Sequence, residues 1–116
     1  MHPNDSLAVV IVAKNEAARI GDCIASAAFA DEVLVLDSGS TDQTAAIARA
    51  AGARVVVTDW PGYGPQVARG FSLAKSDWVL SLDADERVPA KLQAEIRAAI
   101  RAGAKDGYRI PRWSEF

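Results

Sequence analysis

The feature that most constrains the fold of this 116-residue chain is an unbroken apolar run at residues 7–13, LAVVIVA. It is rich in β-branched residues and shows no alternation of polar and apolar positions, which is typical of a strand covered on both faces. Similar short runs predict further strands at residues 32–36, 54–58 and 78–82, with a fifth beginning at residue 107. The first run therefore predicts a central strand of a sheet buried between two layers.

Helical patterns separate these strands. Apolar residues recur there at helical spacing, and we expect helices at residues 16–28, 41–51, 66–75 and 89–102. Asn15 is expected to cap the first helix, and Ser40 with Gln43 to form a capping box for the second. Strands that alternate with helices predict βαβ units with right-handed crossovers. The predicted fold class is therefore α/β, a Rossmann-like three-layer sandwich around a mostly parallel sheet.

The alternation runs through the whole chain, so we expect residues 1–116 to belong to one domain. No linker, low-complexity tract or longer repeat interrupts it. The sequence stops shortly after the expected fifth strand without a polar tail, and we expect the chain to be a truncated part of a longer protein. An open sheet also leaves edge strands through which two copies can pair, so a homodimer is one expected state.

Composition argues against several kinds of site. Cys23 is the only cysteine and His2 the only histidine, which excludes an internal disulfide, a cysteine zinc site and a histidine-centred triad. The net charge is -2 without a run of Lys and Arg, so we expect no nucleic-acid partner. The first strand is not followed by the glycine pattern of dinucleotide-binding folds, and no P-loop sequence occurs.

Polar residues follow the expected strands at the edge of the sheet where open α/β folds bind ligands. Asp83 and Asp85 are two residues apart, so both carboxylates can point to one side while Ala84 stays between them. Oxygen ligands of this kind favour Mg²⁺ or Mn²⁺, and substrate phosphates commonly complete the shell. The pair suggests a metal and nucleoside-diphosphate site, with solvated turn residues as the alternative.

The turn after the second strand carries a further carboxylate. Asp37 is expected at the end of the sheet, where a ribose hydroxyl or a base N–H can donate to it. Lys14 faces either a phosphate or, as we favour, the solvent. Trp60 and Tyr63 are expected to be packing aromatics more than stacking platforms, although their loop lies on the ligand side.

Three segments taken together resemble a known family. They are VIVAKNE at residues 10–16, VLDSGSTD at 35–42 and LSLDADE at 80–86, and in this order they resemble the family 2 glycosyltransferases of GT-A fold. The segment TDWPGYGPQ at 58–66 is similar to a narrower group, the bacterial lipopolysaccharide core β-glycosyltransferases. The resemblance covers nearly the whole chain.

The resemblance implies an inverting transfer of glucose or another hexose from a UDP-sugar to a lipopolysaccharide core or related cell-surface glycan. Mg²⁺ or Mn²⁺ would neutralise the departing diphosphate, with Asp85 as its ligand and Asp83 on the ribose or the metal shell. The donor-binding residues implied are Ala13, Asn15, Glu16, Asp37, Ser38, Arg69, Asp83 and Ala84.

The sequence departs from the family pattern at two places. Ser38 stands where many members have a second Asp that reads the base, which bears on base selectivity. Val67 and Ala68 stand where the narrower group tends to have Lys and Asn. Either a phosphate or donor contact is weakened by this change, or Arg69 takes it over. No candidate for the general base is found, and we expect it beyond residue 116.

The resemblance also implies a setting for the protein. We expect a cytoplasmic protein at the inner face of the bacterial inner membrane, with peripheral membrane association of the full-length chain. Two alternatives stay open: a non-catalytic nucleotide-binding or regulatory module of the same fold, and a nucleotidyltransferase. The latter normally has a glycine-rich turn after the first strand, which Ala13-Lys14-Asn15-Glu16 is not.

Overall fold

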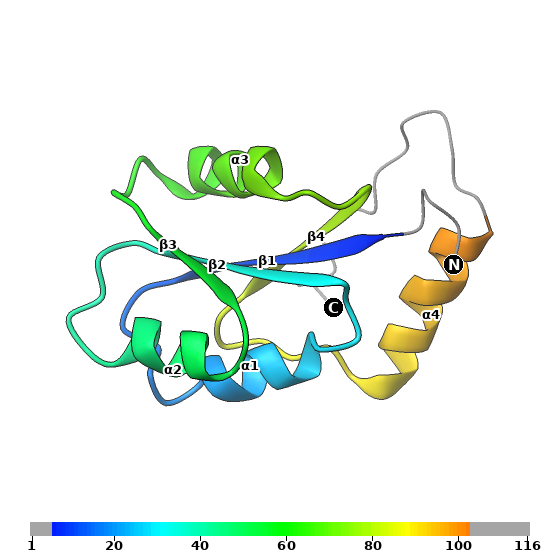
Figure 1. Cartoon of the computed structure of the whole chain (residues 1–116), viewed down its shortest axis with the longest axis horizontal. Helices are drawn as coiled ribbons and strands as arrows, with labels where there is room; N and C mark the ends of the chain where they lie inside the picture. The colour runs from blue at the N-terminus through cyan, green and yellow to red at the C-terminus, as the bar shows by residue number, and fades with distance from the viewer. Residues whose placement is uncertain (1–5, 103–116) are drawn as a thin grey trace.

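A four-stranded sheet forms the middle of the protein in a computed structural model that describes residues 6–102 (Figure 1). The strands are β1 (Leu7–Ala13), β2 (Glu32–Asp37), β3 (Arg54–Val57) and β4 (Trp78–Asp83). They pair in parallel in the order β3-β2-β1-β4. The four expected strands are thus confirmed to within one residue at their ends, while the strand expected at residue 107 lies outside the described residues.

Helices cover both faces of the sheet and complete the predicted three-layer α/β sandwich. They are α1 (Ile20–Ser26), α2 (Thr44–Ala50), α3 (Tyr63–Leu73) and α4 (Ala90–Arg101). Helix α3 lies on one face, and α1 and α2 lie on the other (Figure 1). Within residues 6–102, no helix combines the length and the apolarity needed to cross a membrane.

The two faces of β1 contribute to two separate apolar clusters. Leu7, Val9 and Ile11 pack in the larger cluster, together with buried residues of α1, α2 and α4. Ala8 and Val10 point to the other face and pack beneath α3. Because both faces of β1 are covered, neither set of alternate positions can be polar. The run at residues 7–13 therefore shows no alternation of polar and apolar residues.

The first two helices begin later than the sequence predicts. Helix α1 begins at Ile20 instead of residue 16, because residues 17–19 form a turn that is closed by hydrogen bonds to the Glu16 carbonyl. Helix α2 begins at Thr44 instead of residue 41. Neither helix has a side-chain cap, so the capping roles predicted for Asn15 and for Ser40 are wrong.

Helix α3 begins earlier than predicted, at Tyr63 instead of residue 66. Gly62 precedes it with a φ of 110°, a left-handed conformation that glycine adopts without strain. The chain therefore turns sharply into the helix before the proline at position 65, which lies in the first helical turn, where proline is tolerated. This early start places Tyr63 next to the sheet rather than in a loop.

Gly70 allows α3 to lie directly on the sheet. A Cβ atom at this position would lie 2.4 Å from a methyl carbon of Val10 and 3.2 Å from one of Leu36. Both neighbours are fully buried, and the Val10 side chain has little rotamer freedom. The close spacing between α3 and β1 therefore depends on glycine, which has no side chain, at position 70.

We expect Gly70→Ala to lower the free energy of unfolding by about 1–3 kcal/mol through overpacking, although alanine favours helix formation. Gly64→Ala is the matched control, because it adds the same methyl group to the same helix where nothing lies within 4 Å. It is expected to be neutral or stabilising by up to about 1 kcal/mol. Urea unfolding of both variants measures the difference, and equal stabilities would contradict the close packing of α3.

Candidate functional site

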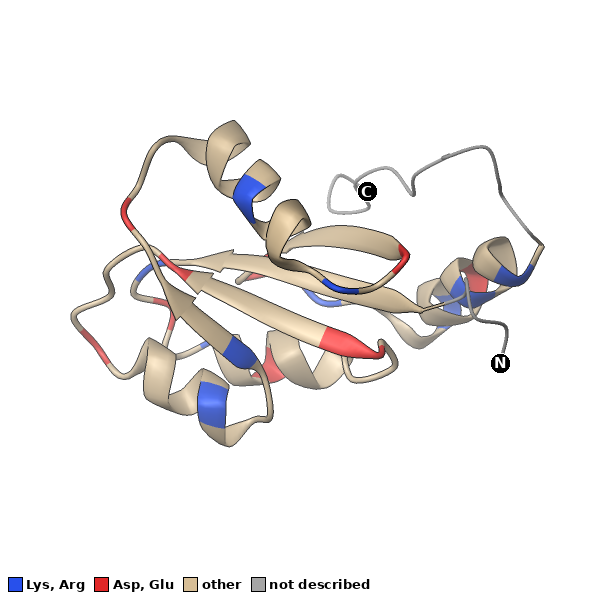
Figure 2. Cartoon of the chain, turned by 45° about the horizontal axis from the view of Figure 1, so that its top comes forward, with Lys and Arg blue, Asp and Glu red and all other residues tan. Residues whose placement is uncertain are grey.

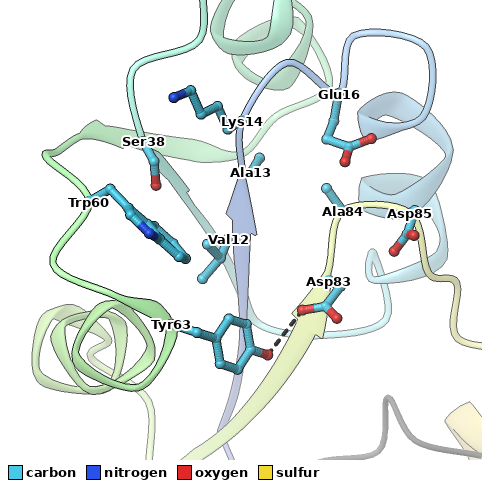
Figure 3. A pocket seen from close by; sticks show the side chains of 10 residues that line it. All are labelled: Val12, Ala13, Lys14, Glu16, Ser38, Trp60, Tyr63, Asp83, Ala84 and Asp85. Atoms are coloured by element: carbon cyan, nitrogen blue, oxygen red, sulfur yellow. Dashed lines mark hydrogen bonds between the residues drawn. The ribbon is translucent and has the colours of Figure 1, made fainter.

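A cavity of about 350 Å³ opens at the carboxyl ends of β1 and β4 (Figure 3). The strand order places it at a reversal: the chain proceeds from β1 to β2 and β3 on one side, then returns to β4 on the other side of β1. Parallel α/β sheets bind their ligands at such a crevice. The cavity is therefore where the fold itself predicts a binding site.

The two sides of the cavity differ in chemistry. Asp83, Ala84 and Asp85 line one side, and Ser38, Trp60 and Tyr63 line the other (Figure 3). The remaining lining residues are Val12, Ala13, Lys14 and Glu16. Three carboxylates thus share the lining with one ammonium group, so the cavity repels an anion unless a cation accompanies it.

Acidic residues alone would not have identified this end of the sheet, because Asp and Glu occur at both of its ends (Figure 2). At the opposite end, the Asp31 carboxylate accepts from the Leu7 N–H at 2.8 Å, and Asp77 accepts from the Ser6 hydroxyl at 2.8 Å. Those carboxylates stabilise the beginnings of strands. At the carboxyl ends, by contrast, Glu16, Asp83 and Asp85 line a cavity.

The turn after β4 holds its two aspartates in different ways. The Asp83 N–H donates to Glu86 Oε1 at 2.8 Å, and the Glu86 N–H donates back to the Asp83 carbonyl at 2.9 Å. The Tyr63 hydroxyl donates to Asp83 Oδ1 at 3.0 Å (Figure 3). Ala84 is buried, whereas Asp85 is exposed. Asp83 is therefore fixed by its neighbours, and Asp85 is free to adjust to a ligand.

The turn after β2 uses Asp37 internally. Its side chain is buried, and Oδ1 accepts from the Ser40 N–H at 3.1 Å and from the Ser40 hydroxyl at 2.5 Å. Ser40 Oγ in turn accepts from the Asn15 N–H at 2.8 Å. Asn15 has a φ of 54°, and its side-chain oxygen accepts from the Thr41 N–H at 2.8 Å. These bonds join the loop after β1 to the loop after β2.

Two further bonds join the same loops. The Glu16 N–H donates to Thr44 Oγ1 at 2.9 Å, and the Ala17 N–H donates to Asp42 Oδ2 at 3.3 Å. The hydroxyl of Thr44 also donates to the Asp42 carboxylate, and this hydrogen bond holds the pKa of Asp42 below its usual value. The backbone that carries Glu16 into the cavity is thus held by the start of α2.

Gln66 is a fully buried polar residue that the sequence analysis did not single out. Its Nε2 donates to Ser38 Oγ at 3.0 Å and to Thr58 Oγ1 at 2.5 Å, and its Oε1 accepts from Arg69 at 3.0 Å. Arg69 also forms an ion pair with Asp59 at 2.9 Å. The sequence did contain a signal that Gln66 is buried. Gln66 and Gly70 are four residues apart, which is about one helical turn, and both lie on the stripe of α3 that faces the sheet.

The predicted site residues fall into two groups. Those that line the cavity are Ala13, Glu16, Ser38, Asp83, Ala84 and Asp85. Asn15, Asp37 and Arg69 do not line it and instead support its loops through the bonds described above. Trp60 and Tyr63, expected mainly as packing residues, both line the cavity, and the Trp60 side chain is 52% exposed.

Cys23 lies behind the acidic turn, with its Sγ 3.5 Å from the Asp83 carbonyl oxygen. The residue is buried. Burial, followed by the negative charge of Glu86 and Asp85, raises the pKa of its thiol from 9.0 to about 12. The group is therefore a neutral packing element and not a nucleophile.

A family model described as Glycosyl transferase family 2 matches residues 8–109. The chain belongs to this family. The resemblance seen in the sequence is thereby confirmed, and the match covers β2, β3, β4 and all of β1 except its first residue.

Two relatives match most of this chain. An uncharacterized glycosyltransferase of Rickettsia bellii is 45% identical over 88% of this chain and 35% of its own length. The lipopolysaccharide core biosynthesis glycosyltransferase LpsC of Rhizobium meliloti is 34% identical over 97% of this chain and 44% of its own length. The chain thus spans less than half of either relative.

Solved structures agree with the fold. Glucosyl-3-phosphoglycerate synthase from Mycobacterium tuberculosis, in complex with Mn²⁺, UDP and glucosyl-3-phosphoglycerate, superimposes with a TM-score of 0.62 at 37% identity. The match covers 68% of this chain and 33% of that protein. A second structure of the same synthase contains Mg²⁺ and UDP, with the same TM-score of 0.62.

Ser40→Ala is expected to lower the free energy of unfolding by about 1–3 kcal/mol, because it removes the hydroxyl bond to the buried Asp37 carboxylate, which keeps only the Ser40 N–H, and leaves the Asn15 N–H without its partner. Ser72→Ala is the control, since among residues 6–102 the Ser72 hydroxyl bonds only to the Arg69 carbonyl of its own helix. Its effect should stay within about 0.5 kcal/mol. Chemical denaturation compares the two, and equal losses would show that Ser40 does not join the loops.

The raised pKa of Cys23 also predicts a pH dependence. As pH rises above 9.0, the unfolded thiol loses its proton while the folded thiol keeps it until about pH 12, so this group destabilises the fold in that window. The wild type should therefore lose more stability than Cys23→Ala over that range. A native thiol that reacts with a maleimide at pH 8 as fast as the urea-unfolded chain would contradict the burial.

Proposed function

We propose that this chain is the donor-binding part of an inverting glycosyltransferase that moves a hexose from a UDP-sugar to a glycan acceptor. The observation that carries the proposal is the cavity at the strand-order reversal, with Asp83 and Asp85 on one side and Ser38, Trp60 and Tyr63 on the other. Family membership gives the class of reaction. The complexes of the mycobacterial synthase with UDP and UDP-glucose support the choice of donor.

The residues present fit a divalent cation. Within residues 6–102, no three His, Cys, Asp or Glu side chains gather as a protein-only metal site. A Mg²⁺ or Mn²⁺ site needs only one or two carboxylates when substrate phosphates and water supply the other ligands. Asp83 and Asp85 would hold the ion, which would offset the negative charge of the departing diphosphate. The excess of carboxylates over ammonium groups in the cavity means that such an ion would strengthen the binding of a diphosphate.

The other lining residues have roles that follow from their chemistry. Ser38 Oγ accepts from Gln66, so its own proton remains available to donate to an oxygen of the nucleotide. Lys14 is exposed beside the cavity and offers a positive charge to a phosphate. Trp60 presents an exposed ring on which a planar base or a sugar can pack.

The acceptor and the setting belong to the full-length protein. We propose a lipopolysaccharide core or related cell-surface glycan as acceptor, because of the similarity to LpsC and the segment at residues 58–66. The same resemblance supports the proposal that the protein acts as a peripheral enzyme at the cytoplasmic face of the inner membrane. The general base is proposed to lie beyond residue 116.

Calorimetric titration of the full-length protein with UDP, UDP-glucose and GDP, each with Mn²⁺ and again with excess EDTA, tests this function. Metal-dependent binding of the uridine nucleotides, followed by transfer of glucose to a core glycan, is the expected result. Binding without transfer to any glycan would favour a non-catalytic nucleotide-binding module. Equal binding of GDP would contradict selection of the uracil base.

Asp85→Ala should abolish the gain in UDP affinity that Mn²⁺ provides, because it removes one of the two carboxylates that hold the ion. Asp77→Ala is the matched control, since it removes an exposed carboxylate at the opposite end of β4. The control should bind UDP and Mn²⁺ as the wild type does. Unchanged metal-dependent affinity in Asp85→Ala would show that the ion lies elsewhere.

A further inference from the structure

We propose that Tyr63 is a positioning residue of the donor site, whose hydroxyl orients the Asp83 carboxylate toward the cation. This inference rests on the proposed function and adds to it a residue from the opposite side of the cavity. The Tyr63 hydroxyl lies 3.0 Å from Asp83 Oδ1, and both residues line the cavity (Figure 3). The two come from different layers, since Tyr63 begins α3 and Asp83 ends β4.

The Asp83 carboxylate needs such a partner. Its backbone is held by the reciprocal bonds with Glu86, but those bonds do not set the direction of the side chain. Within residues 6–102, the Tyr63 hydroxyl is the only hydrogen-bond donor to that carboxylate. It occupies one oxygen and leaves the other available to a ligand. Partners of this kind orient the groups that bind metal ions, and their loss commonly weakens metal binding 10–100-fold.

Tyr63 is itself held firmly. Gly62, with a φ of 110°, turns the chain directly into α3, so the tyrosine starts the helix. The same helix is held on the sheet by the close approach of Gly70 to Val10 and by the buried bonds of Gln66. A side chain on such an element is located more accurately than one on a loop. The hydroxyl therefore links the packing of α3 to the direction of Asp83.

The ring and the hydroxyl of Tyr63 make separable contributions. A role limited to packing or stacking needs only the aromatic ring, which phenylalanine retains. The positioning role needs the hydroxyl, which phenylalanine lacks. Tyr63→Phe thus separates the two roles with the loss of a single oxygen atom.

The test is titration of the full-length protein with UDP in the presence of Mn²⁺ and again with EDTA. Tyr63→Phe is expected to weaken the Mn²⁺-dependent binding of UDP about 10–100-fold and to leave the weak binding in EDTA unchanged. Ser72→Ala is the matched control, because it removes a hydroxyl group from the same helix. In the described part of the chain, that hydroxyl bonds only to the Arg69 carbonyl. The control should bind as the wild type does, and the thermal midpoints of both variants check that they are folded.

A double-mutant cycle with Asp83→Asn shows whether the effect passes through Asp83. In that background, Tyr63→Phe should cause no further loss of Mn²⁺-dependent affinity. Additive losses would mean that the hydroxyl acts elsewhere and would overturn the inference. A Tyr63→Phe protein that binds within about twofold of the wild type would also overturn it, while the proposed function stands. A wild type that fails to bind UDP with Mn²⁺ would overturn both.

Discussion

The parallel pairing of β1 with β4 is the constraint on which the rest of the structure depends. Leu7 lies opposite Trp78 and Val12 opposite Asp83, so the two strands end together at one edge of the sheet. The chain reaches β4 only after running through β2 and β3 on the other side of β1, so the strand order reverses at this edge, where such sheets form a crevice. The cavity and its aspartates follow from this arrangement.

Polar side chains, more than apolar ones, determine the shape of that edge. The loops after β1 and β2 are joined by Ser40 and Asn15, which both span the gap between them. The Gln66 side chain donates a hydrogen bond to the Ser38 hydroxyl, and the Tyr63 hydroxyl donates one to the Asp83 carboxylate. Each of these bonds connects residues far apart in the sequence, so the site is assembled only when the sandwich is complete. The metal and donor would then meet groups that are already in place.

The strands and the start of α4 were predicted accurately, whereas the starts of α1 and α2 were not, for one physical reason. Burial of a strand on both faces depends on apolar residues that are adjacent in the sequence, and residues 7–13 and 78–82 carry that signal locally. The start of a helix depends on where a polar side chain finds its partner. Asn15 and Ser40 have the composition of caps, but their partners lie in another loop, so α1 and α2 begin later than local rules predict.

The sequence by itself determined the α/β class, the parallel strands, the family and the Asp83–Asp85 pair, because each of these features depends on residues that are close along the chain. The tertiary structure decided which of the candidates share the cavity. In the folded protein, Asp37 and Arg69 bond to neighbouring residues and support the loops around the cavity, whereas Trp60 and Tyr63 line it. Whether a side chain faces a ligand or a neighbouring loop depends on distances between segments, and those are set only by the packing of helices on the sheet.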